Sequence, residues 1–139
     1  MILRNIFKNV RESYKHIPYT IKHRKKLIEL SKIYLGKKHY YFHDIDKIIM
    51  YILIPYVGTW NIHKIHAKIS PHHVRYFRGI EHVDKKQAVL DWESARFTKP
   101  DKPWNAAETL MKKYPELLWE FEDTFYDLGL GDQFKKLLY

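Results

Sequence analysis

The sequence predicts an all-α protein, a compact helical bundle of about six to seven helices. Apolar residues recur at helical spacing along almost the whole chain, and no stretch alternates apolar and polar residues with the period of a strand. The length of 139 residues suits one core, so we expect residues 1–139 to form a single domain. The chain holds 9 His and 11 Tyr but no Cys, so any metal site must use nitrogen and oxygen ligands.

Two helices are predicted before Gly36. The first covers residues 2–14 and ends before Pro18, because proline lacks the backbone donor that a helix interior needs. The second covers residues 20–35, and Gly36 is a natural stop for it. His23 falls on the apolar stripe of this second helix, so its side chain should point inward.

A third helix is predicted from about His43 to the segment 55–58. Its first turn presents His43 and Asp44, and Lys47 lies one turn later, so all three side chains can serve one site. Its apolar residues form an amphipathic stripe that we expect to face the core, namely Ile45, Ile48, Ile49, Ile52, Leu53 and Tyr56.

The next segments are less regular. Residues 60–70 carry no clear assignment. Ser70 and Pro71 then suit the N-cap and first position of a short helix through Arg78, which would place His72 and His73 in its first turn.

A helix with a face of small residues follows. Asp84 is expected to cap it, and it should run to Phe97. Ala88, Asp91 and Ala95 share one face, so another backbone can approach Asp91 closely and bury its carboxylate.

The remaining helices are assigned to packing. A proline-rich loop is expected at residues 98–103, followed by helices near 104–113, 116–128 and 131–138. None of these helices contains a histidine, and their aromatic residues and leucines look like core positions.

Charge is distributed unevenly along the chain. Residues 1–80 hold 16 Lys/Arg and 4 Asp/Glu, whereas residues 81–139 hold 9 and 12, so the two parts carry +12 and −3. The basic part indicates a phosphorylated or polyanionic partner. A solvated lysine-rich face, such as that formed by Lys22, Arg24, Lys25 and Lys26, is the alternative.

Candidate ligands concentrate in the same basic part. In chain order they are His23, the dipeptide His43 and Asp44, His63 or His66, the pair His72 and His73, and Asp91. Imidazole nitrogen together with carboxylate oxygen suits divalent ions such as Zn, Mn, Fe, Co or Ni.

This pattern resembles the HD-domain superfamily of metal-dependent phosphohydrolases, helical proteins that share the order H, HD, D, often with HDxxK. Residues 43–47 read HDIDK. The segments 66–77 and 89–92 (VLDW) also look similar to a small group of HD-like proteins from bacteria and phages. The resemblance spans about residues 20–95, the expected metal-site core, and leaves 104–138 as packing helices. The Gly-Tyr-Pro triplet of the cyclic-dinucleotide branch is missing.

The resemblance implies a site with one or two divalent ions, among Mn, Fe, Zn, Co, Ni and Mg. It implies that Lys47 contacts a phosphate oxygen or the nucleophilic water. Arg75 and Arg78, one helical turn beyond His72, could bind further phosphate oxygens. The implied ligands are His23, His43, Asp44 and Asp91 for the first ion, and His66 with His72 or His73 for a second.

The predicted function is that of a metal-dependent phosphohydrolase, with Asp44 and Lys47 as its catalytic residues and a nucleotide or similar small phosphate ester as its substrate. The alternatives are an HD scaffold that binds a metal or nucleotide without turnover, and a basic nucleic-acid-binding module. No membrane partner is expected, and the predicted location is the cytoplasm, that of the host if a phage encodes the protein.

Overall fold

A computed structural model describes residues 1–99, 101 and 103–139, and within these ranges it contains seven α-helices and no strand, which confirms the all-α prediction. The helices are α1 (Ile2–Leu35), α2 (Ile45–Leu53), α3 (Thr59–Ile69), α4 (Lys85–Thr98), α5 (Ala106–Lys113), α6 (Leu118–Asp127) and α7 (Gly131–Leu138). Three single 3₁₀ turns join them, η1 (Pro55–Val57), η2 (Ile80–His82) and η3 (Pro115–Leu117).

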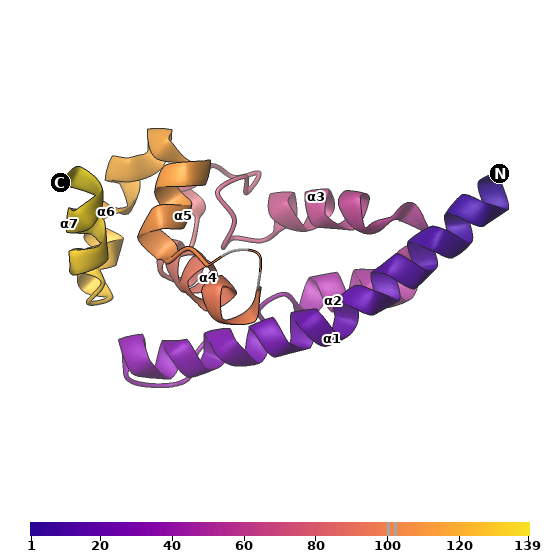
Figure 1. Ribbon diagram of the computed structural model, residues 1–139, viewed down its shortest axis with the longest axis horizontal. Coiled ribbons are helices and arrows are strands. Elements are labelled where there is room, and N and C mark those ends of the chain that lie inside the picture. Colours follow the sequence, from indigo (N-terminus) through magenta and orange to yellow (C-terminus); the bar gives the residue numbers. More distant parts are fainter. Residues whose placement is uncertain (100, 102) are drawn as a thin grey trace.

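Helix α1 replaces the two helices predicted before Gly36, and Pro18 lies inside it. The predicted break is wrong. Before Pro18, Ser13 donates to the Pro55 carbonyl and so ties α1 to the next segment, and across Pro18 the Thr20 hydroxyl donates to the His16 carbonyl within the helix. Proline still removes one helical hydrogen bond, and Figure 1 shows α1 bending along its length.

Helices α2, α3 and α4 pack along α1 (Figure 1). α4 lies over its C-terminal half, α2 and α3 lie beside its N-terminal half, and α5, α6 and α7 gather around the far side of α4. The apolar core joins α1 and α4 to the last three helices through fully buried side chains that include Leu27, Leu90, Leu110, Phe121 and Phe134. The C-terminal helices thus contribute buried side chains to this core.

The stripe of α2 that was predicted to face the core is instead at the surface. Ile49 is 49% exposed, Ile52 54% and Leu53 69%, whereas Tyr51 is buried. The prediction failed because α2 packs through the side that carries Tyr51 and Lys47, next to α1 and α3.

Residues 70–79 form consecutive turns rather than the predicted short helix. Ser70 is the C-cap of α3, which occupies the unassigned segment 60–70. Two backbone bonds hold the turns in place: Phe77 donates to the Lys68 carbonyl, and Asp84 donates to the Pro71 carbonyl. The turn bends the chain so that its histidines approach α2.

The C-terminal part follows the prediction closely. Asp84 caps α4 by accepting a hydrogen bond from the Gln87 amide at 3.1 Å, and α7 has the predicted limits. The predicted loop 98–103 includes Pro100 and Lys102, which lie outside the described residues.

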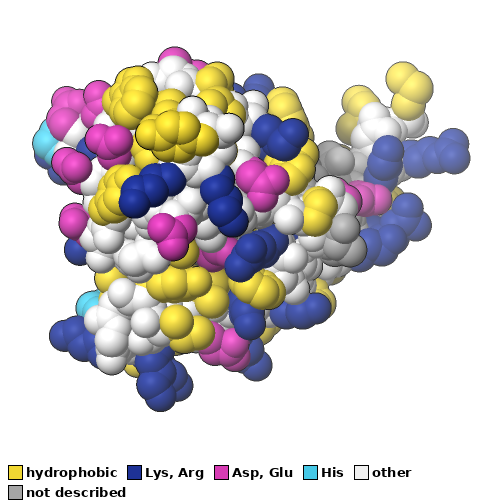
Figure 2. All heavy atoms as spheres, turned by 60° about the vertical axis from the view of Figure 1, so that its left-hand side comes forward, with side chains coloured by type: hydrophobic (Ala, Val, Ile, Leu, Met, Phe, Trp, Pro, Cys, Tyr) yellow, Lys and Arg dark blue, Asp and Glu magenta, His cyan; other side chains and the backbone are white. Residues whose placement is uncertain are grey.

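Figure 2 shows acidic and basic side chains mixed on the face of the C-terminal helices, and mostly basic ones on the projecting N-terminal end of α1. None of the described helices is both long and apolar enough to cross a membrane.

Candidate metal centre

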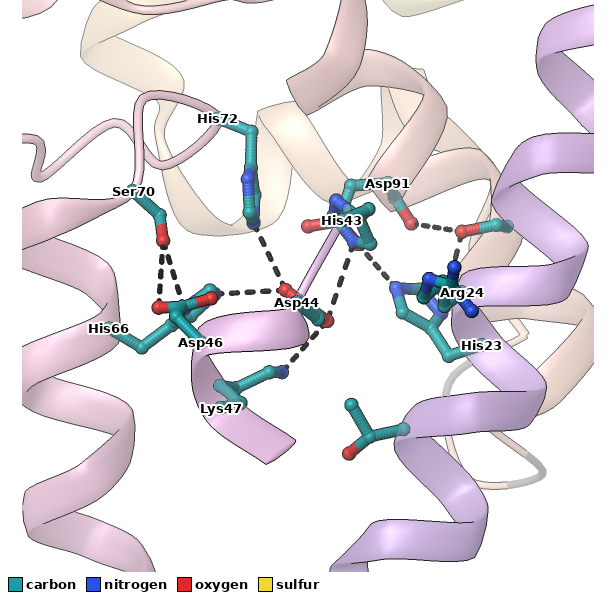
Figure 3. Close-up of polar contacts among 12 residues, drawn as sticks. His23, Arg24, His43, Asp44, Asp46, Lys47, His66, Ser70, His72 and Asp91 are labelled. Atoms are coloured by element: carbon teal, nitrogen blue, oxygen red, sulfur yellow. Dashed lines mark hydrogen bonds and ion pairs between the residues drawn. The ribbon is translucent and has the colours of Figure 1, made fainter. Parts of the chain in front are cut away.

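All seven predicted ligands lie in one cluster, although they come from five separate segments. Figure 3 labels these ligands apart from His73. α1 carries His23, α3 carries His66 and α4 carries Asp91, while the other four lie in the turns before α2 and after α3. Most of these side chains are buried, with exposed fractions of 2% for His43, 3% for Asp44 and 4% for His72.

Asp44 lies at the centre of the cluster. Its Oδ1 is 3.0 Å from His66 Nε2 and 3.2 Å from His72 Nε2, and its Oδ2 is 3.4 Å from His43 Nε2. Lys47 Nζ approaches the same Oδ2 at 3.0 Å. One carboxylate is therefore shared by three imidazoles and an ammonium group.

Asp91 forms the second focus of the cluster. Its Oδ1 lies 2.5 Å from His23 Nε2 and 3.3 Å from His43 Nε2. The other ring nitrogen of His23 lies 3.4 Å from the hydroxyls of Ser94 and Thr98, which hold the ring so that Nε2 faces the carboxylate. His43 thus lies between the two carboxylates.

The donor atoms of this cluster fit a metal ion. Among the described residues, His43 Nε2, Asp44 Oδ1, His66 Nε2 and His72 Nε2 are buried and have no hydrogen-bond partner, because their short contacts lack hydrogen-bond geometry. Ligand atoms bound at about 2.1 Å in tetrahedral or octahedral geometry lie about 3.0–3.4 Å apart. The distances around Asp44 fall in this range, and buried polar atoms otherwise have partners.

Three overlapping sets of these residues could each hold an ion. The first comprises Asp44, His66, His72 and His73, the second His23, His43 and Asp44, and the third His43, His72 and Asp91. Because Asp44 belongs to two sets, the cluster has the donors for one ion or for two neighbouring ions that share this carboxylate.

The turn before α2 aims Asp44 into the cluster. Asp44 adopts φ 60° and ψ 12°, a left-handed conformation that costs free energy for a residue other than glycine. His43 donates its backbone N–H to the Tyr40 carbonyl, and Ile45 donates to that of Phe42, so successive turns keep the chain in place. Strained backbone of this kind is typical of functional sites.

Asp46 orients His66 and was not identified from the sequence. The Nδ1–H of His66 donates to Asp46 Oδ2 at 2.6 Å, which turns Nε2 toward Asp44. Ser70 Oγ also donates to Asp46 Oδ2, at 3.3 Å. A carboxylate behind the ligating imidazole is the usual outer partner in metal sites. Its position within residues 43–47, directly before Lys47, does not distinguish it from an ordinary surface acid.

Both central carboxylates remain ionised. Burial alone would raise the pKa of Asp44, but His43 and Lys47, with the adjoining His66 and His72 imidazoles, hold it well below the usual range. Burial likewise opposes ionisation of Asp91, and the charge of His43 and the contact with His23 keep its pKa well below the usual range.

The imidazoles around Asp44 differ in their tendency to bind protons. Burial and the neighbouring His72 lower the pKa of His73 to about 3. Burial also lowers the pKa of His72, against the effect of Asp44. For His66, burial is outweighed by the two carboxylates of Asp44 and Asp46, which raise its pKa. Neutral imidazole is the form that binds metal, so His72 and His73 are ready to do so at neutral pH.

Two of the cavities that open onto the cluster adjoin each other. The larger, of about 530 Å³, is lined by residues of α1, α2 and α3 and by His73, and the smaller, of about 150 Å³, reaches Asp44, His23 and Asp91. Tyr19, Lys47, His73 and Lys99 line both, so the two cavities are parts of one cleft. Lys15 also lines the larger one and Lys113 the smaller one.

Of the three side chains predicted to contact phosphate, Lys47 contacts Asp44 and lines the cleft. Arg75 and Arg78 are exposed and outside the residues that line either cavity, and the helix that was to place them beyond His72 does not form. Lysines that the sequence analysis did not single out, Lys15 and Lys99, face the larger cavity.

His63 and His66, one turn apart on α3, have different roles. His66 belongs to the cluster, whereas His63 Nε2 lies 2.6 Å from the Tyr51 hydroxyl and its ring contacts His16 edge-on. Burial and then Lys47 lower the pKa of His63 to about 4, so it is a neutral acceptor for Tyr51. This polar group lines the larger cavity and was not found from the sequence, where His16 and His63 have no distinguishing pattern.

No protein-family model matches this sequence, and neither a curated protein nor a solved structure matches the chain.

Proposed function

We propose that this protein is a metal-dependent phosphohydrolase that acts on a nucleotide or a similar small phosphate ester. The observation that carries the proposal is the set of buried, unpartnered donor atoms around Asp44, next to Lys47 and a cleft of about 530 Å³. Such an arrangement has an alternative use as a scaffold that binds metal or nucleotide without turnover.

The donor set suits hydrolysis as well as binding. A divalent ion lowers the pKa of water near it, and this supplies hydroxide near neutral pH. The ion also neutralises charge on phosphoryl oxygens. Asp44 and Asp91 would hold the ion as carboxylates, because the pKa of each is depressed. His23, His43, His66, His72 and His73 supply the remaining ligands.

Lys47 is the residue best placed to bind the substrate phosphate. Its Nζ contacts Asp44 Oδ2 at 3.0 Å and lines both cavities. Burial opposes its charge, but the carboxylates of Asp44 and Asp91 raise its pKa, so it remains an ammonium ion. A phosphate between the cluster and this ammonium would also approach Lys99, which lines the same cavities.

The remainder of the substrate has space in the larger cavity. Tyr19, Tyr51 and His16 offer aromatic faces there, and the pair Tyr51 and His63 offers hydrogen bonds. A pocket of a few hundred Å³ with aromatic walls and few polar groups is typical of small-molecule sites.

A turnover assay on the metal-loaded protein tests the proposal. Wild type should release phosphate from, or open, at least one member of a panel of nucleoside phosphates, cyclic nucleotides and alarmones. Lys47→Ala should lower turnover roughly 100-fold or more while metal content is kept, and Asp44→Asn should abolish both. Lys86→Ala, at an exposed position of α4, is the matched control.

Two results would decide against hydrolysis. A fully metallated protein that turns over nothing in the panel but binds a nucleotide tightly is the scaffold. A protein that takes up no divalent ion after reconstitution has a different function, and nucleic-acid binding through its basic part then becomes the leading explanation.

A further inference from the structure

The outer side of α2 and α3 is an apolar surface. On α2, Ile45 and Ile49 lie about 160° around the helix from Lys47 and Ile52 about 140°, and because Lys47 faces the cleft, these side chains point away from it. On α3, Ile65 and Ile69 flank His66 on the side opposite His63. The two helices adjoin through the bond between Asp46 and His66. We call this surface the outer face. It comprises Ile45, Ile49, Ile52, Leu53, Ile65 and Ile69.

The exposure of the outer face is unusual for a surface that stays in water. Its side chains are 36% exposed at Ile45, 41% at Ile65 and 50% at Ile69, with higher values at Ile52 and Leu53. From residue 48 to residue 57 the chain contains no charged residue. Large exposed apolar patches mark sites of protein or membrane contact.

The charges around the outer face are mostly positive. Residues 30–80 contain only two carboxylates, and both contact His66: Asp44 is buried, whereas the side chain of Asp46 is 32% exposed. Apart from Asp46, the charged side chains on the exterior of this segment are Lys and Arg, including the exposed Lys64 and Lys68 on α3. The outer face therefore combines an aliphatic centre with a positive border.

We propose that the outer face docks on the surface of a lipid bilayer that contains anionic lipids. Aliphatic side chains that enter the headgroup region, with lysines beside them that meet acidic headgroups, are the usual elements of interfacial binding. A second copy of the chain fits less well, because face-to-face packing would bring one positive border against another. Docking leaves the cleft open to solvent, because Lys47 points away from the outer face. The docking proposal does not depend on the proposed hydrolase activity.

Vesicle flotation with the full chain tests the proposal. The protein should float with phosphatidylcholine vesicles that contain phosphatidylserine and much less with pure phosphatidylcholine, and added salt should weaken binding. The double substitution Ile49→Ser and Ile52→Ser should weaken binding at least about tenfold, and Lys64→Gln with Lys68→Gln roughly tenfold. Circular dichroism checks that each variant stays folded. Ile33→Ser, 70% exposed near the C-terminal end of α1, is the control and should bind like wild type.

Three results would overturn the proposal. The first is the absence of flotation with either vesicle. The second is binding that the isoleucine substitutions leave unchanged, because the basic charge alone then accounts for it. The third is a wild-type dimer in lipid-free sedimentation that the same substitutions convert to a monomer, because a second copy then covers the outer face.

Discussion

Asp44 Oδ1 lies 3.0 Å from His66 Nε2, yet neither buried atom makes a hydrogen bond with any of the described residues. A carboxylate and an imidazole at this distance would normally share a proton along their line of approach. Their geometry instead suits two ligands directed at a common third atom. The predictions on metal binding rest on this relationship.

Divalent metal should stabilise the wild-type fold, and Asp44→Asn should remove the effect. An ion that binds only the folded state at about 100 times its Kd adds about 2.7 kcal/mol to the free energy of unfolding. Calorimetry of wild type with and without Mn²⁺ or Zn²⁺ should show a higher Tm that a chelator reverses. Asp132→Asn, at an exposed position of α7, should respond like wild type. Equal metal response in the Asp44 variant would contradict the assignment.

Acid should destabilise the metal-free protein partly through His63. Burial and Lys47 lower its pKa from 6.5 to about 4 in the folded state. Between these values the unfolded chain binds a proton that the folded chain does not, so this contribution to stability is complete above pH 6.5 and is lost as the pH falls toward 4. His63→Gln keeps an acceptor for Tyr51 but cannot titrate. The free energy of unfolding, measured with urea across this pH range, should fall less steeply with decreasing pH for the variant than for wild type. If the two plots of this free energy against pH are parallel, the explanation is refuted.

Glu93 should be a major source of stability at the junction of three helices. This fully buried carboxylate accepts hydrogen bonds from the Ala106 amide and from Gln133, and it pairs with Arg96 at 2.6 Å. Glu93→Ala leaves these groups without their partner and should cost about 3–5 kcal/mol of unfolding free energy. Glu93→Gln retains part of the hydrogen bonding and should cost less. Chemical denaturation measures both, and a loss below about 1 kcal/mol for the alanine variant would contradict the role.

The helical class and the ligand types could be predicted from local patterns. Apolar periodicity identified the third helix, and the Asp84 cap with a face of small residues identified α4. The order of His and Asp residues identified seven side chains that the structure brings into one cluster. These features depend on residue type and spacing alone. The helix end expected before Pro18 was wrong, because contacts of Ser13 and Thr20 on either side of the proline keep α1 continuous.

Features that depend on tertiary packing were beyond the sequence. Periodicity shows that Ile49 and Ile52 share a face, but it does not show whether another element covers that face. The same limit applies to Asp46, whose place on a helix flank says nothing about the imidazole across from it. The turn at residues 70–79 escaped prediction because its defining bond, from Phe77 to the Lys68 carbonyl, spans nine residues.

Asp46 should tune metal affinity without being a ligand. Its carboxylate accepts the Nδ1–H of His66 at 2.6 Å and so directs Nε2 toward Asp44. Losing such an outer partner typically costs about 10–100-fold in metal affinity. Asp46→Ala should therefore bind the same number of ions as wild type at saturation, with a Kd raised by roughly that factor. The Kd of Asp46→Asn should lie between those of wild type and Asp46→Ala, because its amide oxygen can still accept from Nδ1. Isothermal titration with Zn²⁺ or Mn²⁺ gives stoichiometry and Kd separately. Loss of an ion from the stoichiometry would show that Asp46 is itself a ligand, and an unchanged Kd would show that His66 does not bind the metal.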